Sequence, residues 1–291
     1  MIIGHQKIIR FLDKSIENQS LSHAYLFSGP EHVGKFAVAK YFAAKLAGRE
    51  EDINPDIIIL SPEIEEKKGI IKKKDITVEA IRELQKKLSV YPVGKHKIAV
   101  IDDADFLNKS AQNALLKTLE EPPAGVIIIL VVQNTAKIFP TIFSRCQTKK
   151  FSLVSDNNLE KIIPPDCPEK EEIVFWSLGC PGTAKIMSEN REKLEERRKN
   201  YRELYDIISQ NMTEKFSLAE EWSKDTNLLI SRLSWWLVVL RDCFLGDGIK
   251  KIKLTPEKAL KITEKIEEAI EVIKNTNSNP RLVMENLFTI F

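Results

Sequence analysis

A glycine-rich segment near the start of the chain has the residue types and spacing of a phosphate-binding loop. It runs from Gly29 to Phe36 (GPEHVGKF), after a short apolar segment and before a pattern typical of a helix. In a GxxxxGK[ST] loop the glycines let backbone N–H groups surround phosphates, and the lysine reaches the outer phosphates. Gly29, Gly34 and Lys35 are therefore candidate nucleotide-binding residues. The last position normally supplies a hydroxyl for Mg²⁺, but here it is Phe36, which cannot ligate a hard cation.

An acidic cluster follows the apolar segment 97–102 (KIAVID). Asp102 has the position of a carboxylate that could hold Mg²⁺, and Asp103 stands where such ATPases usually keep a glutamate that orients the attacking water. An aspartate is one methylene shorter, and a displacement of about 1 Å near the reacting atoms can cost roughly 10²-fold in rate. Together with Phe36, this predicts a nucleotide fold that has lost hydrolysis and that has no dedicated metal site. The surviving loop and Lys35 are compatible both with binding of ATP or ADP and with a vestigial site.

The elements that would position these residues alternate between strand and helix over residues 1–150. Apolar runs predict strands at 24–29, 56–60, 97–102 and 126–132, and the last of these (VIIILVV) is typical of a central parallel strand. Apolar residues at helical spacing predict helices between these strands, including one capped by Thr77 and one that begins at Asn108 and ends before Pro122-Pro123. Strands that alternate with helices indicate an α/β fold with a parallel sheet.

The strand signal disappears after Phe151. Short helical patterns, interrupted by Pro164-Pro165 and by Cys180-Pro181-Gly182, fill residues 155–190, and helical patterns continue from 191 to the end. We therefore expect three domains: an α/β domain at 1–151, a small helical domain at 152–190 and a helical bundle at 191–291.

The charge balance argues against a dominant phosphate-binding face. In 291 residues, 44 Lys+Arg offset 42 Asp+Glu, which leaves a net charge of +2. The four cysteines are isolated, with no CxxC pair, which disfavours a zinc site or a disulfide framework and suits a reducing cytoplasm. The amino-terminal residues have no apolar signal-peptide core, and no apolar run is long enough to cross a membrane.

Two further features have ordinary structural explanations. The segment 67–74 (KKGIIKKK) holds five lysines and follows EIEE. It could contact DNA, but a solvated loop with offsetting charges is the simpler interpretation. Trp222, Trp235 and Trp236 fall in a helical apolar pattern, so we expect them in the bundle core or in a subunit interface rather than in a base-stacking platform.

Three segments together resemble bacterial AAA+ clamp-loader subunits of DNA polymerase III. They are HAYLFSGPEHVGK (23–35), IDDADFLNKSAQNALLKTLEEPP (101–123) and FPTIFSRC (139–146), with weaker likeness at 177–187 and 279–288. Given the altered phosphate loop, the chain is most similar to the delta-prime type within this family. The resemblance implies an AAA+ P-loop domain, a small helical lid and an all-α collar through which the subunits assemble.

The resemblance also implies roles for particular residues. Arg145 matches the arginine that such a subunit projects at the ATP of its neighbour, where a permanently charged guanidinium stabilises the transferring γ-phosphate. The lid position that often carries a nucleotide-sensing arginine is Thr183, and the first sensor would fall near Gln133-Asn134. The four-cysteine zinc module of many members is missing, because no cysteine precedes Cys146.

The implied function is assistance in ATP-driven loading of the sliding clamp onto primed DNA, without independent ATPase activity, as a subunit of a DNA-directed DNA polymerase holoenzyme. The implied partners are clamp-loader subunits of the gamma/tau and delta types, with the sliding clamp and DNA contacted through the complex and no membrane involved. Two alternatives stay open: a catalytically active ATPase of the gamma/tau type, which Phe36 and Thr183 disfavour, and a protein that binds DNA directly.

Overall fold

The computed structural model describes residues 2–48, 54–67, 70–244, 254–276 and 278–291. The chain divides into two compact units, Met1–Glu189 and Asn190–Phe291. Each unit is described separately below. The domain boundaries expected at residues 151 and 190 stay predictions.

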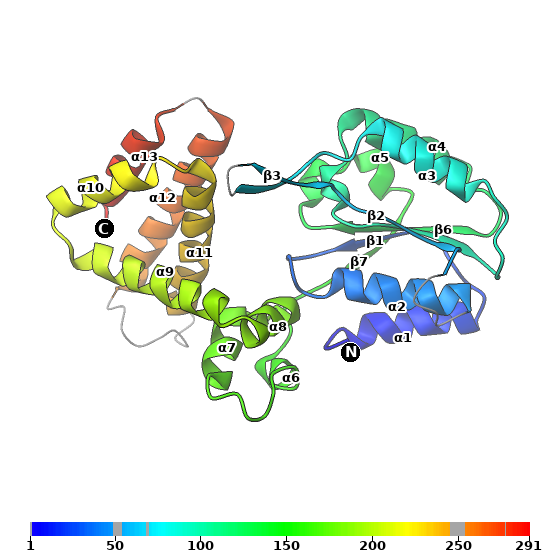
Figure 1. The fold of residues 1–291 in the computed structure, drawn as a ribbon, viewed down its shortest axis with the longest axis horizontal. Helices are drawn as coiled ribbons and strands as arrows, with labels where there is room; N and C mark the ends of the chain where they lie inside the picture. Colours follow the sequence, from blue (N-terminus) through cyan, green and yellow to red (C-terminus); the bar gives the residue numbers. More distant parts are fainter. Residues whose placement is uncertain (1, 49–53, 68–69, 245–253, 277) are drawn as a thin grey trace. The chain divides into compact units, whose positions relative to one another are not determined.

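The first unit is built on a parallel sheet of five strands in the order β2-β5-β6-β1-β7 (Figure 1). Every strand pair in this sheet is parallel. The predicted α/β class and four of its strands are thereby confirmed, while β7, a short polar strand, was not predicted. The strands are β1 (Ala24–Ser28), β2 (Ile57–Leu60), β5 (Lys97–Ile101), β6 (Val126–Val132) and β7 (Gln147–Lys150).

Helices cover both faces of this sheet, with α1 and α2 on one face and α3 and α4 on the other (Figure 1). All residues of β1, β5 and β6 are buried, because each of these central strands must pack against both helical layers. Their alternate side chains therefore supply two separate apolar cores. The helices that accompany the sheet are α1 (Gln6–Glu17), α2 (Lys35–Ala47), α3 (Val78–Leu88), α4 (Lys109–Glu120) and α5 (Pro140–Phe143), together with the short 3₁₀ segments η1 (Ala104–Phe106) and η2 (Thr135–Lys137).

The expected helix caps are present. The Thr77 hydroxyl accepts a hydrogen bond from the Ala80 N–H at the start of α3, and the Asn108 carbonyl oxygen accepts one from the Ala111 N–H at the start of α4. Helix α4 ends at Glu120, before Pro122, as predicted.

The lysine-rich segment at 67–74 differs from the solvated loop that we expected. Strands β3 (Ile64–Lys67) and β4 (Ile70–Lys73) form an antiparallel pair in which Ile64 lies opposite Lys73 and Glu65 opposite Lys72. Lys68 and Gly69 lie outside the described residues. Opposite charges support this pairing next to its Ile64–Lys73 end, where the Lys74 ammonium lies 3.8 Å from the carboxylates of Glu63 and Glu65.

Three short helices complete the first unit: α6 (Asp156–Leu159), α7 (Lys170–Ser177) and α8 (Pro181–Glu189). Helix α7 ends at Ser177; the capping residue Leu178 has a positive φ of 54°, and Gly179 follows with a φ of 76°. The Val154 N–H donates to the Gly179 carbonyl at 2.8 Å, and a side chain at 179 would meet Leu153 and Val154. Glycine is therefore required where the chain turns from α7 into α8.

The second unit is all-helical in its described residues. Trp222 and Trp236 contact each other with ring centroids 5.6 Å apart, and Phe288 and Phe291 pack around them. Trp222, Trp235 and Trp236 are all buried, so of the two expected locations, bundle core or subunit interface, they occupy the core. The helices are α9 (Arg191–Ser209), α10 (Met212–Trp222), α11 (Thr226–Phe244), α12 (Pro256–Asn275) and α13 (Pro280–Phe288).

Truncation of Leu26 tests the sheet core. Leu26 is fully buried in β1 and packs in the α3–α4 core. We expect Leu26→Ala to lower the free energy of unfolding by about 2–5 kcal/mol, since it leaves a cavity between tightly packed layers. Urea denaturation followed by circular dichroism measures this. The control Val90→Ala, at a side chain that is 60% exposed, should change stability by less than about 0.5 kcal/mol.

Candidate functional site

The candidate site lies where three neighbouring strands of the parallel sheet end. Gly29 follows β1, Asp102 follows β5 and Gln133 follows β6. Since β5, β6 and β1 are adjacent and parallel, their carboxyl ends meet at one edge, which is where ligands bind in such sheets. A cavity of about 280 Å³ opens there; its lining includes Gly34, Lys35, Lys73, Asp102 and Gln133.

The glycine-rich loop has the backbone conformation that its sequence predicts. Gly29 has a φ of +151°, and a Cβ at this position would lie 2.5 Å from the Phe151 carbonyl oxygen. Gly34 has a φ of +106° immediately before α2. Both positions therefore need glycine, the first because of a close approach and the second because of its conformation.

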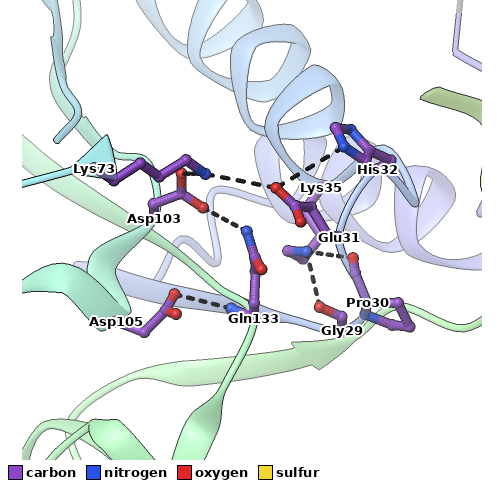
Figure 2. A network of polar contacts seen from close by, with 9 residues as sticks. All are labelled: Gly29, Pro30, Glu31, His32, Lys35, Lys73, Asp103, Asp105 and Gln133. Carbon is purple, nitrogen blue, oxygen red and sulfur yellow. Dashed lines mark hydrogen bonds and ion pairs between the residues drawn. The ribbon is translucent and has the colours of Figure 1, made fainter. Parts of the chain in front are cut away.

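Lys35 is the first residue of α2, and its ammonium lies inside the loop. Its Nζ donates to the carbonyl oxygens of Gly29 at 2.8 Å and Pro30 at 2.5 Å (Figure 2). Lys35 is only 5% exposed. Burial lowers the pKa of its ammonium, and the nearby carboxylates of Asp103 and Asp102 oppose that change. The lysine side chain thus ends among the carbonyl oxygens of the loop.

Phe36 occupies the position of the usual magnesium ligand. Its ring lines the cavity and packs in part against the core under α2, with the Lys40 ammonium 5.1 Å from the ring centroid. The ring offers no oxygen to a cation.

The two aspartates after β5 have different environments. Burial, and then the charge of Asp103, raise the pKa of the Asp102 carboxyl. Asp103 has both carboxylate oxygens engaged: Oδ1 accepts a hydrogen bond from Gln133 Nε2 at 2.7 Å, and Oδ2 accepts one from Lys73 Nζ at 2.5 Å (Figure 2). Asp105, also near this edge, accepts a hydrogen bond from the Gln133 N–H. In this arrangement each Asp103 oxygen already accepts one hydrogen bond, and one of the two donors is a cation.

Lys73, at the end of β4, is the site residue that sequence reasoning missed. Its ammonium also lies 3.5 Å from the Glu31 carboxylate of the glycine loop. Burial alone would lower the pKa of Lys73, but the hydrogen bond and charge of Asp103 and the charge of Glu31 outweigh it, so the pKa is raised. The sequence does not distinguish Lys73 from the other four lysines of segment 67–74. Only the pairing of β4 with the preceding strand β3 indicates which lysine reaches the cavity.

These residues do not fit a divalent cation of the kind that accompanies ATP in P-loop proteins. The hydroxyl ligand is replaced by Phe36, and the charges of Lys73 and Lys35 already act on Asp102, the carboxylate that the cation would need. Among the described residues, no group of three or more His, Cys, Asp or Glu side chains could hold a metal ion.

Helix α8 contacts the glycine loop through its own glycine. The Gly182 N–H donates to the His32 carbonyl at 2.8 Å, and a Cβ at 182 would lie 3.0 Å from that oxygen. Thr183, at the expected position of a sensing arginine, is half-buried on this helix. The helical segment after residue 152 therefore meets the nucleotide loop directly.

Arg145 lies apart from this cavity. It follows α5, and its guanidinium donates to the Thr141 carbonyl at 2.9 Å and pairs with Glu120 at 2.7 Å. Both side chains are accessible, at 34% for Arg145 and 51% for Glu120. The structure thus brings Gly29, Gly34, Lys35 and Asp102 together but leaves Arg145 outside their site. The adjacent Cys146 is no nucleophile, since burial raises the pKa of its thiol to about 12.

The described helices include none that is long and apolar enough to cross a membrane.

The helix-flanked parallel sheet, with a glycine loop and lysine after β1 and acidic residues after β5, defines the AAA+ class of P-loop proteins. A solved structure with this fold is a DNA polymerase III gamma-subunit-related protein from Thermotoga maritima, which has a TM-score of 0.54 and 17% identity and covers 98% of this chain and 97% of its own. The model of the family described as "DNA polymerase III, delta subunit" matches residues 4–155, just over half of the chain, and the chain belongs to this family.

Two curated relatives show how far the similarity extends. DNA polymerase III subunit delta' of Bacillus subtilis is 27% identical over 97% of this chain and 94% of its own length. Subunit tau of the same organism is 33% identical over 59% of this chain, but the match spans only 32% of that relative. The chain is therefore a relative of clamp-loader subunits of DNA polymerase III.

Substitution of Gly182 tests the contact between α8 and the loop. We expect Gly182→Val to lower the free energy of unfolding by about 1–3 kcal/mol, because the new side chain overlaps His32 and forces the helix or the loop to shift. The backbone N–H of residue 182 should also exchange with solvent faster than in the unaltered chain. Lys185→Ala, at an exposed position of the same helix, should leave both readouts unchanged.

Proposed function

We propose that this chain is a delta-prime-type subunit of a replicative clamp loader in the cytoplasm. In this role it assembles with gamma/tau-type and delta-type subunits and takes part in ATP-driven loading of the sliding clamp onto primed DNA. Family membership and the similarity to a delta' subunit over nearly the whole length of both chains support this assignment.

We propose further that the chain does not hydrolyse ATP. The observation that carries this proposal is the engagement of both Asp103 oxygens, one by Gln133 and one by Lys73. A carboxylate that is ion-paired to an ammonium is a weaker base for an attacking water, and Phe36 removes the metal ligand as well. Thr183 offers no charge from α8. Three separate positions, Asp103, Phe36 and Thr183, therefore support the loss of hydrolysis.

A catalytically active subunit of the gamma/tau type is the second candidate, and the 33% identity to a tau subunit favours it. In that candidate Lys35 binds the outer phosphates of ATP and Asp102 holds Mg²⁺. This candidate therefore predicts ATP turnover by the purified chain that is abolished by Lys35→Ala.

The isolated chain should show no ATP turnover above background in a phosphate-release assay. Phe36→Thr should not restore it, because the hydroxyl returns a metal ligand while Asp103 stays bound to Lys73 and Gln133. Turnover by the unaltered chain that disappears in Lys35→Ala would establish the second candidate instead. Circular dichroism of each variant checks that the fold is retained.

Arg145 is the residue that we assign to the neighbour's ATP site. Its guanidinium lies outside the chain's own cavity, and its partner Glu120 is half-exposed. An exposed ion pair of this kind contributes little to stability, so exchanging the Glu120 carboxylate for a phosphate on another subunit costs little. A guanidinium also offers several N–H donors in a plane that matches phosphate oxygens.

The assignment of Arg145 is tested in the complex reconstituted with its cognate ATPase subunits. Arg145→Ala should leave assembly intact on gel filtration and lower ATP turnover by about 10³-fold at the site that it serves, together with clamp loading. Arg145→Lys should recover only part of the activity, because an ammonium cannot bind phosphate through two parallel N–H donors.

Glu120→Gln is the matched control. It removes the ion pair within the chain but keeps the guanidinium, so ATP turnover and clamp loading should stay at the level of the unaltered complex. Full activity in the Arg145→Ala complex would contradict the assignment.

A further inference from the structure

The cavity at the glycine loop contains a second ammonium group that ordinary phosphate loops do not need. Lys73 reaches it from the β3–β4 hairpin, and its Nζ lies 2.5 Å from Asp103 and 3.5 Å from Glu31 (Figure 2). Lys35, at the start of α2, also lines this cavity, and its ammonium donates to the Gly29 and Pro30 carbonyl oxygens. Two lysines from distant parts of the chain therefore line one space of about 280 Å³.

The ammonium of Lys73 stands against Asp103, next to Asp102, the carboxylate that a bound divalent cation would need. A cation arriving at Asp102 would lie near the charges of Lys73 and Lys35, and it would find Phe36 in place of a hydroxyl ligand. Magnesium demands oxygen ligands in near-octahedral geometry and gives up its waters reluctantly. The cavity therefore disfavours Mg²⁺ by charge and by ligand type.

The same arrangement favours phosphate groups without a metal. Lys73 neutralises Asp103, so that Asp102 is, among the described residues that line the cavity, the one carboxylate without an ion-pair partner that a phosphate there would face. The remaining unpaired charges are the partly buried Asp102 and the ammonium of Lys35, while Glu31 is half-exposed at the rim and screened by solvent. Free N–H groups at the start of α2 add partial positive charge.

A neighbouring cavity supplies room for the rest of a nucleotide. It has a volume of about 520 Å³ and shares Gly34, Ala37 and Gly182 with the phosphate cavity. Ile2, Ile3, Ile162, Pro164 and Pro181 make much of its wall apolar. An apolar wall next to a charged one suits a nucleoside joined to phosphates.

The geometry points to a nucleotide site that works without a divalent cation, in which Lys73 takes the place of the metal beside the phosphates of a nucleoside di- or triphosphate. This inference deepens the proposed function, because it rests on the absence of hydrolysis at this cavity. A hydrolytic site needs its cation to neutralise charge in the transition state, whereas a site that only binds can use a fixed ammonium.

Calorimetric titration of the full chain with ADP and with ATP tests the inference. We expect binding with the same affinity, within about threefold, in Mg²⁺ and in EDTA. Affinity that Mg²⁺ raises tenfold or more would overturn it, and so would the absence of binding in both buffers.

Variants at two adjacent lysines identify the group responsible. Lys73→Met should weaken binding in EDTA about tenfold or more, because one charge-assisted contact to phosphate is lost. Lys73→Arg, which keeps the positive charge, should bind within a few-fold of the unaltered chain. Lys74→Met is the matched control, since Lys74 lies 3.8 Å from Glu63 and Glu65 and does not line the cavity.

Equal binding by Lys73→Met and Lys74→Met would overturn the role of Lys73. The magnesium comparison uses the unaltered chain, so it decides the question even where Lys73→Met fails to fold. Because Arg145 does not line the cavity, Arg145→Ala should bind nucleotide normally. Failure of this inference is therefore distinguishable from failure of the proposed role of Arg145 in the complex.

Discussion

The parallel pairing of β5, β6 and β1 is the constraint on which the rest of the first unit depends. Pairing in one direction places the loop after β1, the aspartates after β5 and Gln133 after β6 at a single edge. It also buries each strand on both faces, which requires helices on both sides and thus the crossovers between strands. The glycine loop and the acidic residues, far apart in sequence, meet only because of this register.

Charge at that edge is balanced within the chain. Lys35 is enclosed by loop carbonyls, and Lys73 joins Asp103 to Glu31, so the cavity keeps its shape through its own ion pairs and hydrogen bonds. Helix α8 adds a backbone contact to the loop at His32. The site is therefore preorganised by groups from four separate segments.

The parts of this site that depend on a local sequence pattern could be predicted from the sequence. The loop, Lys35 and Asp102 could be predicted because each follows a short apolar strand, and the glycine positions follow from backbone geometry. Lys73 could not, because its place depends on a two-stranded pairing across residues that read as a charged loop. Strand β7 was missed because its residues are polar and its place comes from pairing with β1. Arg145 could be singled out only by resemblance, since nothing in its spacing relates it to the cavity.

Strand β7 is an edge of the sheet, and it follows Arg145 directly. Its outer side presents unpaired backbone groups, which in many proteins recruit a strand from another chain. Here the strand is only four residues long, QTKK, and Lys149 stacks on the Phe11 ring. Short length and adjacent lysines oppose edge-to-edge association, so two such subunits resist fusing their sheets into one continuous aggregate. The edge of the sheet near Arg145 thereby avoids an unspecific contact made by its backbone.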